Sequence, residues 1–314
     1  MEMSRKPRPP THSELSLCSG DYALSFLPDL GGSLSRLTWR GRDMLRPARA
    51  EIVDPFDAAS FPLVPYANRI ANGVFRFEGQ EIRLTPNLES HPHPLHGQAW
   101  LAPWRVVEQD EDRARLLFLH DIPDEWPWAY SVEQIIALSA DGVRIDLRIA
   151  NLSQEAMPVS YGFHPYFPKL PGARFITAAR GVWLADEDLV PTVPADGSHF
   201  LSLEKGVDLA TAPFVDHCHT GWRGAATIIQ PSQGMSLEME ASPDLGFLHI
   251  FTPKAAAFFC LEPVSAMPDA MNRSEPDAVT GLKKIAPGET ASAYITLSAR
   301  TFDASKQSKD RSAT

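Results

Sequence analysis

The sequence predicts an all-β fold, a large antiparallel β-sandwich, from three observations. Apolar and polar residues alternate in many short segments, as in strands that are buried on one face. The 28 prolines among 314 residues recur too often for long helices but suit turns and sheet edges. Strand patterns do not alternate with helical ones, and no fixed-period repeat marks a propeller or solenoid.

The expected strands are taken in chain order. DYALSFLPDLGG covers residues 21–32, and GVFRFEGQEIRL, 73–84, predicts a hairpin around a Glu-Gly turn. The clearest alternation is in GVRIDLRIAN, 142–151, where four aliphatic residues fall on one side of an extended chain. GMSLEMEAS, 234–242, and ASAYITLSAR, 291–300, repeat this pattern. Strands of this kind need a second sheet to cover their apolar faces, which favours a sandwich.

The chain is expected to form one domain between two disordered tails. Residues 1–13 and 303–314 contain too little apolar surface to offset the cost of ordering them. Nothing between them has the composition of a linker, and large all-β domains commonly exceed the usual domain length. We therefore expect a single β-sandwich domain over residues 14–302.

Composition narrows the classes of function. The formal net charge of −10 argues against an extended surface for nucleic acids or anionic membranes and favours a neutral small-molecule partner. The N-terminus lacks the apolar stretch of a secretory signal, and no segment approaches about 18 consecutive apolar residues, so a cytoplasmic protein is expected. The three cysteines are too few and scattered for a disulfide framework and are expected to be reduced, buried thiols.

The segment HPHPLHG, residues 91–97, places three histidines within seven positions and raises the question of a metal site. His91 and His93 would point the same way on an extended chain, but no acidic ligand follows them, and Pro92 and Pro94 favour a loop. These two are expected to be surface loop residues without a metal. His96 differs because Gly97 permits close backbone approach, so it is the candidate functional histidine.

Five segments then occur in one order along the chain: PLVPYANRIANGVFRFEG (62–79), PLHGQAWLAPW (94–104), YGFHPYF (161–167), VDHCHTGW (215–222) and FFCLEPVSAMPDAMN (258–272). Together they resemble the aldose 1-epimerases, also called galactose mutarotases, from about Leu15 to Thr301. The resemblance implies a large β-sandwich with a sugar cleft on a concave face.

The resemblance also implies roles for five residues. Arg69, in the Asn-Arg motif, contacts the sugar, and Asp216 binds sugar hydroxyls. His96 binds substrate and supports catalysis. His164, before Pro-Tyr-Phe, is the general acid, and Glu262, in Leu-Glu-Pro, is the catalytic base.

One position departs from the pattern of the family. VDHCHTGW has His219 where an aromatic residue is usual, and this departure lies close to Asp216. Asp216 also has a structural interpretation as a turn residue, since aspartate is common in turns.

The chemistry of anomer interconversion needs one base and one acid, which we expect on opposite sides of the sugar, and no cofactor or metal. Each candidate also has a structural interpretation. Glu262 could sit at the exposed end of a strand beside Pro263, and His164 could pack between its neighbours with a ring nitrogen satisfying a carbonyl. Arg69 could pair with a surface acid.

The sequence therefore predicts a cofactor-free aldose 1-epimerase that acts on a free monosaccharide such as galactose or glucose. Two alternatives stay open. The first is a non-catalytic carbohydrate-binding or sugar-sensing sandwich that has the sugar pocket but no activity. The second is a hexose-6-phosphate 1-epimerase, which would need a cluster of cations to bind the phosphate. The sequence offers only Arg69, Arg76 and Arg83 for such a cluster, and these three are dispersed. Five tryptophans, Trp100, Trp104, Trp126, Trp128 and Trp222, include possible stacking surfaces for a sugar.

Overall fold

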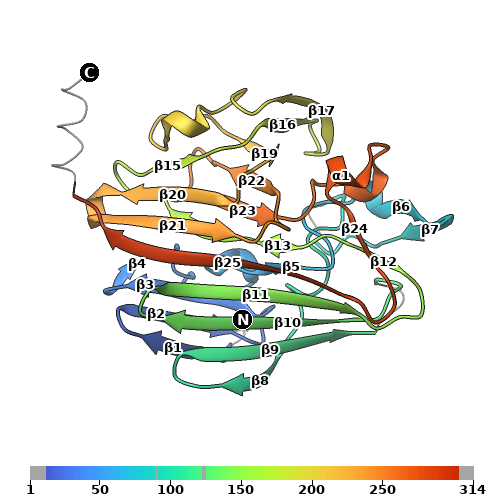
Figure 1. Cartoon of the computed structure of the whole chain (residues 1–314), viewed down its shortest axis with the longest axis horizontal. Coiled ribbons are helices and arrows are strands. Elements are labelled where there is room, and N and C mark those ends of the chain that lie inside the picture. The colour runs from blue at the N-terminus through green and yellow to red at the C-terminus, as the bar shows by residue number, and fades with distance from the viewer. Residues whose placement is uncertain (1–11, 89–90, 122–124, 304–314) are drawn as a thin grey trace, which may run out of the picture.

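The computed structural model describes residues 12–88, 91–121 and 125–303, and strands dominate this part of the chain (Figure 1). Its largest sheet has nine antiparallel strands, in the spatial order β18 (Val207–Asp208), β15 (Arg174–Thr177), β20 (Ala225–Gln230), β21 (Met235–Ala241), β25 (Thr290–Thr301), β11 (Gly142–Asn151), β10 (Tyr130–Ser139), β9 (Arg113–His120) and β8 (Arg105–Gln109). The long strands β25, β11 and β10 lie at its centre.

A second sheet of eight strands carries the residues of interest. Its order is β17 (Pro191–Asp196), β16 (Gly181–Ala185), β19 (Asp216–Thr220), β22 (Phe247–Phe251), β23 (Phe258–Val264), β13 (Gly162–Phe163) and β5 (Pro62–Leu63), with β14 (Tyr166–Pro168) paired to β23. All of these pairs are antiparallel.

Smaller elements complete the fold. A four-stranded sheet contains β1 (Leu15–Ser19), β2 (Tyr22–Leu27), β3 (Ser33–Trp39) and β4 (Arg42–Asp43), and two ribbons pair β6 (Val74–Phe77) with β7 (Gln80–Arg83) and β12 (Met157–Val159) with β24 (Lys283–Ile285). The described α-helix is the short α1 (Asp277–Thr280). No helix in the described ranges is both long and apolar enough to cross a membrane.

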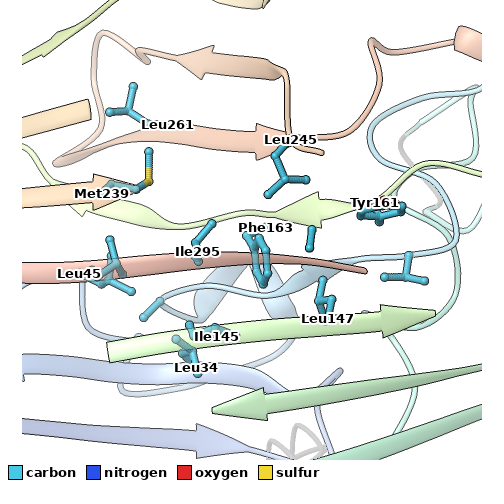
Figure 2. Close-up of a cluster of buried hydrophobic side chains, with 14 of the residues drawn as sticks. Leu34, Leu45, Ile145, Leu147, Tyr161, Phe163, Met239, Leu245, Leu261 and Ile295 are labelled. Carbon is cyan, nitrogen blue, oxygen red and sulfur yellow. The ribbon is translucent and has the colours of Figure 1, made fainter. Parts of the chain in front are cut away.

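The core lies where the sheets face one another. Figure 2 shows one cluster that contains Leu147 and Ile295 of the nine-stranded sheet, Phe163 and Leu261 of the eight-stranded sheet, and Leu34 of the four-stranded sheet. Each of these side chains is at most 3% exposed. Burial of such side chains contributes about 1.5–3 kcal/mol each, and this favours stacking of the sheets. The predicted antiparallel β-sandwich is confirmed.

The local predictions also hold in most places. Buried and exposed residues alternate along β11, and β6 and β7 form the predicted hairpin, with Gly79 of its turn at φ 83°. Residues 91–97 lie in a loop. Two expectations were wrong. Cys18 is exposed, and His93 is buried, with its Nδ1 accepting a hydrogen bond of 3.0 Å from the Asn72 amide.

The two expected tails fall mostly on residues 1–11 and 304–314, which lie outside the described residues. Ser13, within the first tail, is described, and its amide donates to Asp29.

Candidate active site

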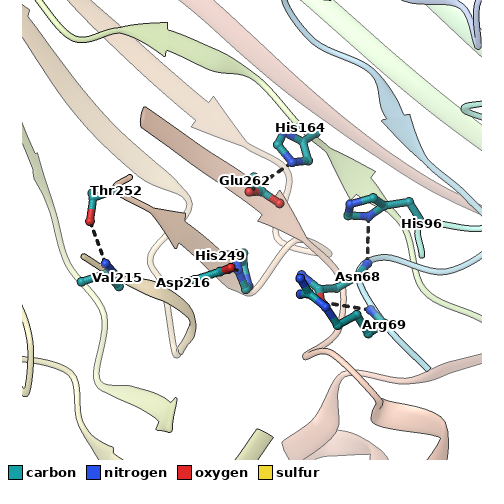
Figure 3. Close-up of polar contacts among 9 residues, drawn as sticks. All are labelled: Asn68, Arg69, His96, His164, Val215, Asp216, His249, Thr252 and Glu262. Carbon is teal, nitrogen blue, oxygen red and sulfur yellow. Dashed lines mark hydrogen bonds and ion pairs between the residues drawn. The ribbon is translucent and has the colours of Figure 1, made fainter. Parts of the chain in front are cut away.

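A cavity of about 340 Å³ opens over one face of the eight-stranded sheet, and all five residues singled out from the sequence line it: Arg69, His96, His164, Asp216 and Glu262. They come from distant parts of the chain, from Arg69 near the N-terminal end to Glu262 near the C-terminal end. The cavity is within the usual size range of small-molecule sites, about 300–1,000 Å³. Asp216, His249 and Glu262 lie on β19, β22 and β23, whereas Arg69, His96 and His164 lie outside the strands. Figure 3 shows these side chains around one site.

Strand register brings the two carboxylates together. β22 lies between β19 and β23, and His249 on β22 is directly opposite Glu262 on β23. Asp216 on β19 is opposite Phe251, two positions further along β22. Since alternate residues of a strand share a face, Asp216, His249 and Glu262 all point into the cavity. Glu262 is only 3% exposed, so the exposed strand end that was its structural alternative is wrong.

Glu262 and His164, the candidate base and acid, are in contact with each other. His164 Nε2 lies 3.4 Å from Glu262 Oε1. The two groups were expected on opposite sides of a sugar, but Gly162 of β13 pairs with Val264 of β23, and this register sets the two side chains side by side. The His164 ring stacks between Phe61 and Tyr166, at 4.6 and 4.7 Å between ring centroids.

His96 is held by the loop that the sequence indicated. Its backbone is left-handed, with φ 59°, and its Nδ1 accepts a hydrogen bond of 3.0 Å from the Asn68 amide. Nε2 must then carry the hydrogen of the neutral ring and serve as a donor. Gly97 is required beside it, because a Cβ there would lie 2.2 Å from the Val64 carbonyl oxygen. The predicted close backbone approach is confirmed.

Arg69 is a buried cation at the edge of the cavity. It is 8% exposed, its guanidinium donates to Asn68 Oδ1 at 2.9 Å, and its Nε has no hydrogen-bond partner among the described residues. Burial lowers the pKa of Arg69, while the carboxylates of Asp216 and Glu262 raise it. The fork of donors is therefore positioned beside two carboxylates rather than in a surface ion pair.

Asp216 forms a hydrogen bond with His249, a residue outside the five sequence motifs. His249 Nε2 lies 2.6 Å from Asp216 Oδ1, and His249 is 5% exposed (Figure 3). The start of β19 is fixed nearby, where the Val215 amide donates to Thr252 Oγ1 at 3.0 Å. A lone histidine inside the apolar run GFLHIF was the available signal. The unusual His219 is fully buried and does not line the cavity.

The cavity environment separates the pKa values of its ionisable groups. Burial raises the pKa of Glu262 to about 7, against the opposing charges of His249 and Arg69. Burial and the charge of His249 lower the pKa of His164 to about 3. At neutral pH His164 is therefore uncharged in the resting protein, and a proton shared by the pair sits on Glu262.

The aromatic part of the cavity wall comes from Phe56, Tyr166, Phe251 and Phe258. None of the five tryptophans considered from the sequence lines the cavity, and each is at most 6% exposed. Trp100 has a supporting position, because its Nε1 donates to the carbonyls of Leu95 and Gly97, on both sides of His96. These tryptophans are packing residues.

Among the described residues, the group that could hold a metal ion is not the histidine pair His91 and His93 suggested by the sequence. Potential ligand atoms of His164, Cys260 and Glu262 lie within 4.8 Å of one another, whereas His91 and His93 belong to no such group. A metal bound there would occupy the lone pairs that the base and the acid need for proton transfer.

If the protein has the activity that the sequence predicts, extensive chelation is expected to leave the rate of anomer interconversion unchanged. The rate would be followed by polarimetry before and after dialysis against a strong chelator. A loss of activity that one added divalent ion specifically restores would contradict this.

Comparison with known proteins finds similarity over most of the chain. A family model described as aldose 1-epimerase matches residues 13–298. The uncharacterized protein YphB of Escherichia coli K12 is 34% identical over 282 residues, which cover 86% of this chain and 93% of YphB.

Solved structures are similar over nearly the whole chain. A candidate aldose 1-epimerase from Escherichia coli K12 superimposes with a TM-score of 0.85 and 31% identity, covering 93% of this chain and all of that one. A galactose mutarotase-like protein from Clostridium acetobutylicum has a TM-score of 0.83 at 22% identity and covers 93% and 96% of the two chains.

Proposed function

The chain belongs to the aldose 1-epimerase family, and on that basis we propose that it is a mutarotase, which interconverts the α and β anomers of a free monosaccharide such as galactose or glucose. The observation that carries this proposal is the buried contact of 3.4 Å between Glu262 and His164 in a cavity of sugar size. Added to freshly dissolved α-glucose or α-galactose, the protein should speed the change of optical rotation to its equilibrium value.

The reaction proceeds by ring opening and closure. Glu262 takes the proton of the anomeric hydroxyl while His164 gives a proton to the ring oxygen, and the bond between C1 and the ring oxygen breaks. The aldehyde rotates about the bond from C1 to C2, and the ring closes with the two roles exchanged. Both reacting oxygens are bonded to C1, so an acid and a base that lie side by side can reach both.

The proton count of the pair supports these roles. One shared proton is enough, because Glu262 gains a proton as His164 loses one. In the resting protein that proton sits on Glu262, since the pKa of Glu262 is about 7 and that of His164 is about 3. The catalytic form has it on His164, reached by transfer across the contact of 3.4 Å. Arg69, His96 and Asp216 hold the sugar oxygens, as donors and acceptor respectively.

A neutral substrate is supported by the charges of the cavity. Arg76 and Arg83 lie on the β6–β7 hairpin near Glu81, away from the cavity. The cavity is instead lined by two other arginines, Arg46 and Arg49, which do not belong to the sequence motifs.

These two arginines are the specific observation in favour of a phosphorylated substrate, but both are already engaged. Arg49 pairs with Asp57 at 3.0 Å. Arg46 donates to the Phe56 and Ala58 carbonyls and lies over the Tyr166 ring. Asp54 and Asp57 also line this part of the cavity and would repel a phosphate.

Glucose and galactose are therefore expected to have a higher kcat/KM than their 6-phosphates, because Arg46 and Arg49 are already engaged and the carboxylate of Asp54 would repel the phosphate. Parallel measurements of anomer exchange by NMR at constant ionic strength check this. A higher value for a 6-phosphate than for its parent sugar would move the assignment to the hexose-6-phosphate 1-epimerases.

The non-catalytic carbohydrate-binding or sugar-sensing alternative has less support, because a binding site does not need a buried base in contact with an acid. Burying a carboxylate costs free energy unless the carboxylate is paired, so its presence in the cavity is better explained by catalysis than by binding alone. We also propose that residues 14–302 work as one domain, since one core cluster includes side chains from all three large sheets. The proposal includes a cytoplasmic location and no cofactor.

A further inference from the structure

We infer that His249 is a positioning residue for this reaction: together with Asp216 it forms a fixed ion pair that controls how firmly Glu262 and His164 hold their shared proton. The inference rests on the proposed function and adds a residue that neither the motifs nor the family description assigns. The evidence for it is the geometry of three neighbouring strands. The experiment below distinguishes an error in the role of His249 from an error in the proposed function.

His249 occupies the centre of the polar cluster. It lies directly opposite Cys218 on one neighbouring strand and Glu262 on the other, so its side chain is the cross-strand neighbour of the base. Its Nε2 is 2.6 Å from Asp216 Oδ1. Its Nδ1 is buried and has no hydrogen-bond partner in the part of the chain that the structure describes, and the residue lines the cavity.

The ring is held in its charged form. Burial alone would oppose the charge, but the hydrogen bond to Asp216, with smaller support from Cys218 and the charge of Glu262, raises the pKa of His249 to about 10. Burial would raise the pKa of Asp216, but the hydrogen bond to His249 and the charges of His249, Arg69 and His217 together lower it. A short contact between a buried imidazole and a carboxylate is the arrangement expected of an ion pair.

This charge acts on both members of the catalytic pair. The charged and titratable groups around the cluster come from three places. Arg46, Arg69, His96, His164 and Tyr166 come from the segments beside the sheet, Asp216, His217, Cys218 and His219 from β19, and Cys260 and Glu262 from β23. Among them, His249 lowers the pKa of Glu262 against burial and also lowers that of His164. Without His249 both groups would hold their protons more tightly.

The consequence is a limit on activity at high pH. The reaction requires the Glu262–His164 pair to keep one proton, and that proton is lost as pH rises through the pKa of Glu262, about 7. The kcat/KM of the wild-type protein should therefore fall above this pH. Removing a positive charge within about 4–6 Å changes a neighbouring pKa by about 1–3 units. In the His249→Gln protein the fall should therefore move upward by about one unit or more.

The experiment measures kcat/KM for one sugar between pH 5 and 9 in the wild-type, His249→Gln and His217→Gln proteins, in buffers that catalyse mutarotation poorly. Gln keeps a hydrogen-bonding side chain beside Asp216 but carries no charge. His217 is a matched control, because it is on β19 next to Asp216 but stacks on Phe200, 4.5 Å away, and does not line the cavity. Its variant should keep the wild-type profile.

An upward shift of the high-pH limb in the His249→Gln protein, with no shift in the His217→Gln protein, supports the inference. A uniform loss of activity at every pH, or an unchanged profile, would overturn it, because a purely structural role does not move the limb. If this variant does not fold, or the wild-type protein shows no mutarotation, ¹⁵N NMR of the wild-type histidines decides. The His249 ring should keep both nitrogens protonated to pH 8, and titration near pH 6.5 would refute the ion pair whatever the protein's activity.

Discussion

Replacing Glu262 by Gln should lower kcat for mutarotation by roughly 10² to 10⁴, the usual contribution of a general acid–base group. Gln has the same shape and can still form hydrogen bonds, but it cannot accept the anomeric proton. At about 1.4 kcal/mol per factor of ten, the expected loss is about 3–5 kcal/mol of barrier. Folding should be retained, since Glu262 is 3% exposed and its carboxylate is disfavoured by burial.

The control is Glu240→Gln, which makes the same change at an exposed position of β21. Initial rates would be measured for both proteins above the spontaneous background, in a buffer that is itself a poor catalyst. Near wild-type kcat in a folded Glu262→Gln protein would remove Glu262 from the role of base.

The second large effect is expected for His164→Asn, which removes the imidazole that protonates the ring oxygen. The single variant should also lose roughly 10² to 10⁴ in kcat. Because His164 and Glu262 exchange protons in one step, the double variant should lose less than the product of the two single losses. This non-additivity follows from the contact of 3.4 Å between them.

Kinetics of the two single variants and the double variant, measured on one sugar, complete the cycle. The three losses would be compared only after circular dichroism shows that each protein is folded. Losses that multiply fully would mean that the two side chains act in separate steps, contrary to the mechanism proposed here.

Much of the fold could be predicted because strand burial leaves a local pattern. Alternation in 142–151 depends only on which residues face the core, and β11 forms there as expected. The hairpin at 74–83 depends on a turn of two residues, Glu78 and Gly79, and it too is local. Cys18 and His93 show the limit, since their exposure depends on contacts made by distant segments.

The site was less predictable from local patterns. Five of its residues were found through motifs spread along the chain, but their side-by-side arrangement depends on strand register, such as the pairing of Gly162 with Val264. His249 lies outside those motifs, and its position opposite Glu262 is visible only when β22 and β23 are paired. Arg46 and Arg49 reach the cavity through the segment around Phe56, which has no strand pattern.

The central claim is that the protein catalyses mutarotation, and relaxation of freshly dissolved pure anomers tests it most directly. The α-anomers of glucose, galactose and several other free aldoses would be followed by polarimetry and by NMR with and without the protein. The account predicts faster relaxation to an unchanged equilibrium for at least one neutral sugar, and loss of this acceleration in Glu262→Gln. Binding of these sugars to the wild-type protein with no acceleration of any of them would contradict it and would indicate a carbohydrate-binding protein.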